Sequence, residues 1–245
     1  MHAVHRLYQY RKSLSTTEFK ARGQRVKRCE LCRLSIKYCI CPQLPSTMSN
    51  AAFLILMYDT EVLKPSNTGR LIADLIDDTF AFLWSRTEHD PQLVELINDD
   101  KWQPFVVFPS EYAEVNTKIY NDKVDCLPNK RPLFIMLDGS WREAKKMYRK
   151  SPYLANLPVV SFDPEKFGQS SRYQIRSAAN DNQLATAEVA ARVLSMYGEE
   201  ENANLLDLWF DVFSYQYQRS VCQTNKGNPA ALDNLAKFLQ EREIK

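Results

Sequence analysis

The sequence predicts an α/β fold in which a mainly parallel sheet is sandwiched by helices. Five apolar runs have the length of strands, and most are continuously apolar, which is typical of strands buried on both faces. Helical patterns lie between them, as expected for a parallel sheet. After residue 185 the pattern becomes helical, so we expect a helical C-terminal part. A chain of 245 residues is long enough to bury a sizeable core.

Local patterns predict the elements in chain order. Strands are expected at residues 53–57, 79–84, 105–108, 133–137 and 157–162. Apolar stripes predict helices between strands, one at Leu71, Ile72, Leu75 and Ile76 and another at Leu93, Leu96 and Ile97. Three further helices are expected at residues 186–196, 205–217 and 229–241.

The first 41 residues differ in charge from the rest of the chain. They hold ten Lys or Arg residues against Glu18 and Glu30, a balance of +8, and the whole chain carries +2, so the remainder carries −6. A basic segment on a mildly acidic body is typical of a protein that binds a polyanion, most often nucleic acid. The alternative is a solvated basic tail without a partner.

Four of the six cysteines lie inside this basic segment, with the spacing Cys29-x2-Cys32-x6-Cys39-x-Cys41. Because no apolar signal segment opens the chain, four thiols so close together favour a metal over disulfides. Zinc accepts four thiolates in a tetrahedral structural site. Redox or iron–sulfur ligation is the alternative. The metal would fold the short segment and hold its cations as a docking surface.

A second motif follows the expected strand at residues 133–137. The chain reaches Asp138, turns at Gly139 and restarts as a helix, with Ser140 and Glu143 at the S-x-x-E spacing of a capping box. Ligand sites of α/β proteins lie at such carboxyl ends of strands. Trp141 in the first helical turn favours stacking on a planar base. The alternative is a strand that ends in an acid before an ordinary capped helix.

Two further segments offer small polar groups at predicted helix starts, where free backbone amides can bind a ligand. One is Lys64-Pro65-Ser66-Asn67-Thr68-Gly69-Arg70-Leu71, and the other is Thr186-Ala187-Glu188 with Arg176 upstream. Taken alone, each is better interpreted as a helix cap. The chain has only six glycines, and none forms a G-x-G-x-x-G or Walker loop, which excludes the common glycine-rich modes of nucleotide binding.

Taken in order, these motifs resemble those of DTW-domain proteins over roughly residues 20 to 240. The ordered set is the cysteine motif, Asp59-Thr60-Glu61 with residues 64–71, Leu137-Asp138-Gly139-Ser140-Trp141, and Arg176 with Thr186-Ala187-Glu188-Val189-Ala190. More specifically, the chain looks like the bacterial tRNA-uridine aminocarboxypropyltransferases. The family usually has D-x-T-W, whereas this chain has Ser140 in the third place. Serine keeps the capping hydroxyl, so we expect activity to survive the loss of a threonine methyl.

The resemblance implies a SPOUT-like α/β fold, a class in which the chain can be knotted. It implies a basic zinc module at residues 1–45 and a DTW catalytic domain at residues 46–245. It also implies that S-adenosylmethionine donates its 3-amino-3-carboxypropyl group to N3 of a uridine in the tRNA variable loop, releasing 5'-methylthioadenosine. The alternatives are a SPOUT-type RNA methyltransferase and a non-catalytic zinc-dependent RNA-binding protein.

The chemistry of this reaction and the positions of the basic residues predict individual roles. Asp138 is the expected general base or stabiliser of the sulfonium, and Trp141 stacks on adenine or the target base. Cofactor contacts are expected at Asn67, Thr68, Leu137, Gly139, Ser140, Trp141, Thr186 and Glu188, with Arg176 paired to the donor carboxylate. Phosphate contacts are expected at Arg22, Arg25, Lys27 and Arg28 and at Arg142, Lys145, Lys146 and Arg149.

The sequence shows no membrane signal. No run approaches the roughly 18 apolar residues of a membrane span. We therefore expect a cytoplasmic protein that works as a monomer, with tRNA and S-adenosylmethionine as its partners.

Overall fold

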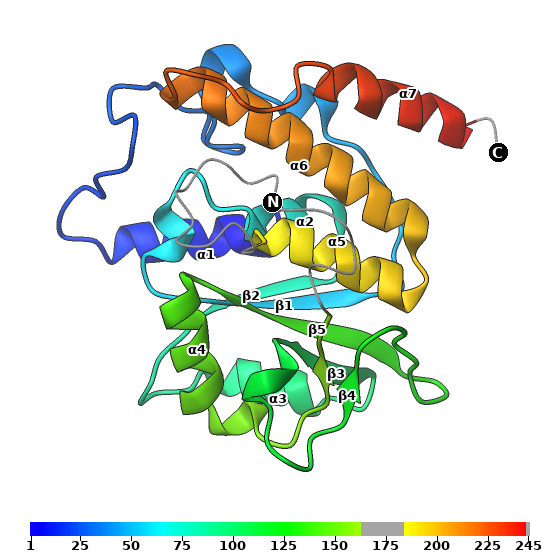
Figure 1. Ribbon diagram of the computed structural model, residues 1–245. Helices are drawn as coiled ribbons and strands as arrows, with labels where there is room; N and C mark the ends of the chain where they lie inside the picture. Colours follow the sequence, from blue (N-terminus) through cyan, green and yellow to red (C-terminus); the bar gives the residue numbers. More distant parts are fainter. Residues whose placement is uncertain (163–183, 244–245) are drawn as a thin grey trace.

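A parallel sheet forms the centre of the molecule in this computed structural model, which describes residues 1–162 and 184–243 (Figure 1). In the described residues the sheet has six strands in the order β2-β1-β5-β3-β6-β4, and every neighbouring pair is parallel. The strands are β1 (Ala52–Met57), β2 (Thr79–Leu83), β3 (Trp102–Val107), β4 (Ile119–Tyr120), β5 (Arg131–Asp138) and β6 (Val159–Val160). The predicted α/β class is confirmed.

Helices cover both faces of this sheet (Figure 1). They are α1 (Ala3–Ser13), α2 (Gly69–Leu75), α3 (Pro91–Asn98), α4 (Trp141–Lys150), α5 (Thr186–Tyr197), α6 (Glu200–Val221) and α7 (Ala231–Glu243). On one face α1, α2 and α5 pack on the strands, with α6 and α7 outside them. On the other face lie α3 and α4. The SPOUT-like class and a knot within it stay predictions.

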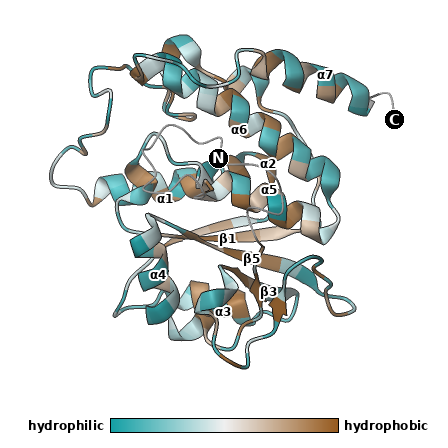
Figure 2. Ribbon diagram, in the orientation of Figure 1, coloured by the Kyte–Doolittle hydropathy of each residue, from teal (hydrophilic) through white to brown (hydrophobic). Residues whose placement is uncertain are grey.

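The continuously apolar strands are explained by two cores, one on each face of the sheet. In β1, Phe53 and Ile55 belong to the core under α2 and α5, whereas Leu54 and Leu56 belong to the core under α3 and α4. All six residues of β1 are buried. Figure 2 shows apolar residues along β3 and β5 between helices that carry many hydrophilic ones. Because these strands are buried on both faces, their sequences do not alternate between apolar and polar residues.

Two elements were not expected from the sequence. Among the described residues the two-residue strand β4 pairs with β6 alone, and its Ile119 is 38% exposed, so this strand has no apolar pattern of its own. Helix α1 lies in the basic segment, and only one end of it is buried. Val4 in that end is fully buried, in the same core as Phe53. Its burial attaches the N-terminal segment to the sheet.

The strand order places a topological switch point between β1 and β5. The chain leaves β1 through α2 and returns at β2 on one side, whereas it leaves β5 through α4 and returns at β6 on the other side. Parallel sheets bind ligands where successive connections diverge in this way. Met57 and Asp138, the last residues of the two strands, are paired in register. In the described residues, no helix is both long and apolar enough to cross a membrane.

Candidate functional site

The carboxylate of Asp138 joins the three polar segments that the sequence singled out. Its Oδ2 accepts a hydrogen bond of 2.7 Å from Nδ2 of Asn67, and its Oδ1 accepts one of 2.6 Å from Oγ1 of Thr186. Asn67 lies just before α2, and Thr186 is the first residue of α5. Asp138 itself is only 3% exposed. The end of β5 and the starts of two helices therefore meet at one buried carboxylate.

Gly69 allows the first turn of α2 to approach this carboxylate. A Cβ atom at Gly69 would lie 2.7 Å from Oδ2 and 3.2 Å from Cγ of Asp138. Real Cβ atoms essentially never come this close to another heavy atom, so a larger residue would push the two segments apart. The absence of a side chain at Gly69 therefore lets α2 pack directly against the carboxylate of Asp138.

A second buried carboxylate, that of Glu61, lies beside the first. It is 2% exposed and accepts a hydrogen bond of 3.3 Å from Nδ2 of Asn67. Nζ of Lys64 lies 2.6 Å from its Oε2. Glu61 belongs to the motif Asp59-Thr60-Glu61, but the sequence analysis predicted no role for it. Its position shortly after the end of a predicted strand could have indicated a site residue. The amide of Asn67 thus bridges two buried acids.

The remaining residues expected to contact the cofactor shape the turns around this network. Ser140 is the N-cap of α4, and Oε2 of Glu143 accepts from its amide at 2.7 Å and its hydroxyl at 2.6 Å, which confirms the predicted cap. Oε2 of Glu188 accepts from the amide of Ala185 at 2.8 Å. Other expected residues are placed as follows: Leu137 and Gly139 flank Asp138, Thr68 is buried at the start of α2, and Arg176 lies outside the described residues.

Trp141 lies in an aromatic cluster with the loop that follows β3. Its ring stacks on Phe108 with centroids 5.5 Å apart and meets the edge of Tyr112 at 5.9 Å. Nζ of Lys145 lies 5.1 Å from the Trp141 centroid. The indole is 37% exposed, so it retains a surface that can meet a base.

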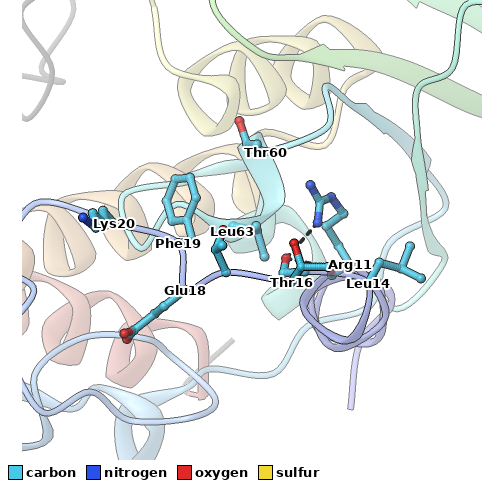
Figure 3. A pocket seen from close by; sticks show the side chains of 10 residues that line it. Arg11, Leu14, Thr16, Glu18, Phe19, Lys20, Thr60 and Leu63 are labelled. Atoms are coloured by element: carbon cyan, nitrogen blue, oxygen red, sulfur yellow. Dashed lines mark hydrogen bonds between the residues drawn. The ribbon is translucent and has the colours of Figure 1, made fainter.

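A cavity of about 490 Å³ opens beside the Asp138 turn, lined by Tyr58, Ser140, Arg142, Glu143 and Lys146. A smaller groove of about 290 Å³ lies against the loop after β1, lined by residues that include Phe19, Thr60 and Leu63 (Figure 3). Arg11 forms part of that groove, where it donates to Oγ of Ser15 at 2.9 Å. The first of these cavities shares Ser140 with the predicted cofactor turn.

The four clustered cysteines have the geometry of a tetrahedral metal site. Their Sγ atoms all lie within 4.8 Å of one another, with Cys29 and Cys41 at 3.8 Å and Cys32 and Cys39 at 3.7 Å. Four thiolates at the usual zinc–sulfur distance of about 2.3 Å would be separated by about 3.8 Å. The residues therefore fit a four-thiolate metal site.

This cysteine segment is attached to α2 through a buried guanidinium. Arg70 is 1% exposed and donates to the backbone carbonyl of Cys32 and, at 3.2 Å, to Oδ2 of Asp74. Burial alone would raise the pKa of Asp74, but the charge of Arg70 and hydrogen bonds from His2 and Trp209 hold that pKa well below its usual range. The cysteines thus support the helix whose start contacts Asp138.

The basic residues of the cysteine segment divide into two groups. Arg22, Arg25 and Lys27 are exposed. Arg28 instead donates to the backbone carbonyls of Arg33 at 3.0 Å and Arg22 at 2.9 Å, and burial lowers its pKa. Its guanidinium holds the loop together.

The basic residues of α4 also differ in their contacts. Arg142, Lys146 and Arg149 are exposed, whereas Lys145 is half-buried with its Nζ 4.3 Å from the Tyr112 centroid. Nζ of Lys146 donates to the hydroxyl of Tyr58 at 3.2 Å. Helix α4 therefore presents cations beside the Asp138 turn, as the sequence predicted.

Known proteins place this arrangement in a family. A family model described as the DTW domain matches residues 26–218. The chain is 27% identical over 181 residues to a protein of Macaca fascicularis named tRNA-uridine aminocarboxypropyltransferase 2, a match that covers 71% of this chain and 57% of that protein. It is 24% identical over 181 residues to a Drosophila melanogaster protein of the same name, covering 70% of this chain and 67% of that one. No solved structure matches. Because the family model covers residues 26–218, most of the sequence, the chain belongs to the DTW-domain family.

Proposed function

We propose that the protein transfers the 3-amino-3-carboxypropyl group of S-adenosylmethionine to N3 of a uridine in the tRNA variable loop. Membership of the DTW family and the names of the two relatives support this activity. The observation that carries it in the structure is the carboxylate of Asp138, which accepts hydrogen bonds from Asn67 and Thr186 at the carboxyl ends of β1 and β5.

The donor would bind at this network. S-adenosylmethionine carries a sulfonium cation and an ammonium group, and the buried acids Asp138 and Glu61 would provide a complementary negative field. The turns at Asn67–Thr68, Leu137–Ser140 and Thr186–Glu188 would supply backbone and hydroxyl contacts. Arg176 would pair with the donor carboxylate.

The reaction forms a bond between uridine N3 and Cγ of the donor while the bond between Cγ and sulfur breaks. The electron pair of that bond stays on sulfur, and neutral 5'-methylthioadenosine leaves. Uridine N3 loses its proton to solvent water in the open cavity. The pocket must present Cγ, and not the methyl carbon, in line with N3.

Of the two roles expected for Asp138, we propose the stabiliser. Both oxygens of its carboxylate already accept hydrogen bonds, from Asn67 and Thr186, so Asp138 would hold in place the two helix starts that bind the donor. Its carboxylate would lie opposite the sulfonium cation. Trp141 would offer its exposed face to a base of the RNA.

We propose zinc as the ion held by Cys29, Cys32, Cys39 and Cys41. A closed four-thiolate site supplies structure and leaves no position for substrate. It would hold the exposed cations Arg25 and Lys27 in place to contact tRNA phosphates.

One assay tests the proposal against its two alternatives. Purified protein is incubated with unmodified tRNA and S-adenosylmethionine, and the products are identified by mass spectrometry. The proposal expects 5'-methylthioadenosine and a uridine heavier by the aminocarboxypropyl group. S-adenosylhomocysteine would instead indicate a methyltransferase, and neither product would indicate a non-catalytic RNA-binding protein.

A further inference from the structure

We propose that the 490 Å³ cavity beside Asp138 seats the acceptor nucleotide, with the ring of Tyr58 as the surface on which the target base stacks. Lys146 and Arg142, which line the same cavity, would face its phosphate. This inference rests on the proposed function, because it assigns the second substrate of that reaction to a place next to the donor.

Tyr58 lies directly beside the Asp138 turn. It follows directly after Met57, which is paired in register with Asp138. The amide of Tyr58 donates to the carbonyl of Asp138 at 2.9 Å. A Cβ atom at Gly139 would lie 3.2 Å from Cβ of Tyr58, so the two turns are in close contact. A base on Tyr58 would therefore lie beside a donor held at Asp138, as transfer between two bound substrates requires.

The charges around Asp138 separate the two substrates. The buried acids Asp138 and Glu61 suit a sulfonium cation. Among the described residues that line the adjoining cavity, two are cations, Arg142 and Lys146, and one is an acid, Glu143, which is held by the amide and hydroxyl of Ser140. Such a lining disfavours a cationic donor and favours a nucleotide with its phosphate.

The ring of Tyr58 is held in place by its neighbours. It stacks on Trp84 with centroids 5.6 Å apart and an interplanar angle of 20°. Trp84 is buried and anchored, because its Nε1 donates to Oγ of Ser151 at 2.9 Å. Nζ of Lys146 holds the Tyr58 hydroxyl. Tyr58 is the aromatic side chain among the described residues lining this cavity, whereas Trp141 packs on Phe108.

Variants of Tyr58 test the inference under single-turnover conditions with saturating S-adenosylmethionine. Tyr58→Leu should slow formation of 5'-methylthioadenosine by roughly 5- to 150-fold, the range for loss of one base–aromatic stack. Tyr58→Phe keeps the ring and should retain the rate within about threefold, as should Tyr10→Leu, a matched control at a tyrosine that is 58% exposed on α1. Donor affinity, measured by equilibrium dialysis, should stay within about twofold in all three variants.

A crosslink tests the same contact without relying on the variants. A tRNA transcript carrying 4-thiouridine is irradiated with the wild-type protein, and the crosslinked peptide and nucleotide are identified. The inference expects the nucleotide that becomes modified to crosslink to Tyr58 itself, as located by fragmentation of the crosslinked peptide. A crosslink of that nucleotide to the side chain of Trp141 or of Phe19, or full activity of Tyr58→Leu, would overturn it while leaving the proposed function intact. Absence of 5'-methylthioadenosine with the wild-type protein would instead overturn the proposed function.

Discussion

Asn67 and Asp138 are 71 residues apart in the sequence and share a hydrogen bond of 2.7 Å in the buried centre of the site. The same amide nitrogen reaches Glu61 at 3.3 Å. One neutral side chain thus holds two buried acids, and a donor cation would lower the repulsion between them. This relationship leads to the first two predictions.

Replacing Asp138 with asparagine should abolish most of the activity. Asp138→Asn removes the charge and turns an NH₂ group toward one of two donors, Asn67 or Thr186. Turnover should fall by roughly 100-fold or more, and unfolding should become easier by about 1–3 kcal/mol because a buried polar group loses its partner. Product release by mass spectrometry and denaturant titration measure the two effects. Asp122→Asn, at an exposed position, is the control, and full turnover by Asp138→Asn would contradict the role proposed for the carboxylate.

Adding a methyl group at Gly69 should weaken donor binding. The new Cβ would lie 2.7 Å from Oδ2 of Asp138, so the carboxylate or α2 must move. We expect Gly69→Ala to cost about 1–3 kcal/mol of stability and to reduce affinity for S-adenosylmethionine, measured by calorimetry. Gly198→Ala is the matched control. Its φ of 93° strains an alanine, but nothing lies within 4 Å of the added Cβ, so it should lose stability and keep donor affinity.

Removing one thiol from the cysteine cluster should release the metal. Cys39→Ser should lower bound zinc, measured by inductively coupled plasma mass spectrometry, from about one ion per chain to well below that. The melting temperature should fall with it, because the cysteine segment packs in the main core through Leu34 and Ile40. Cys222→Ser lies outside the cluster and should keep the ion. Equal zinc content in both variants would argue against the site.

Neutralising exposed cations of the cysteine segment should weaken tRNA binding and its dependence on salt. The double variant Arg25→Ala, Lys27→Ala should reduce the slope of log affinity against log salt by about 2, or about one per phosphate contact. Arg28→Ala should act differently, because its guanidinium bonds the carbonyls of Arg33 and Arg22. It should lower the melting temperature and leave the slope unchanged. An unaltered slope in the double variant would remove this segment from the RNA interface.

The buried pair of Arg70 and Asp74 should make stability depend on acid pH. The folded state holds the pKa of Asp74 below its unfolded value of about 3.9. A depressed pKa contributes stability above the unfolded pKa, and this contribution is lost as pH falls. Asp74→Asn should therefore cost about 3 kcal/mol near pH 7, with the difference from wild type shrinking below pH of about 4. Urea titrations across this range measure it, with the exposed Asp100→Asn as control.

The local patterns of the sequence determined the class of the fold and the chemistry of its motifs. Continuous apolar runs predict strands covered on both faces, and β1, β2, β3, β5 and β6 appear where those runs lie. The cysteine spacing predicts a metal site, and the spacing of Ser140 and Glu143 predicts a cap. These features depend on neighbours within a few residues of each other, and such neighbours can be recognised in a linear sequence.

Only the tertiary structure decided which residues meet. The order of the strands brings Asn67 and Thr186, which lie on either side of Asp138 in the sequence, to the two oxygens of its carboxylate. The folded structure also directs the guanidinium of Arg28 to a carbonyl of its own loop. It places Tyr58 in the lining of the cavity and packs Trp141 on Phe108. No local sequence pattern predicts these partners, because most of the contacts join segments that are distant in the sequence. Such segments meet only when both cores on the sheet are formed. The sequence therefore determined the groups available for chemistry, and packing of the helices on the sheet determined their partners.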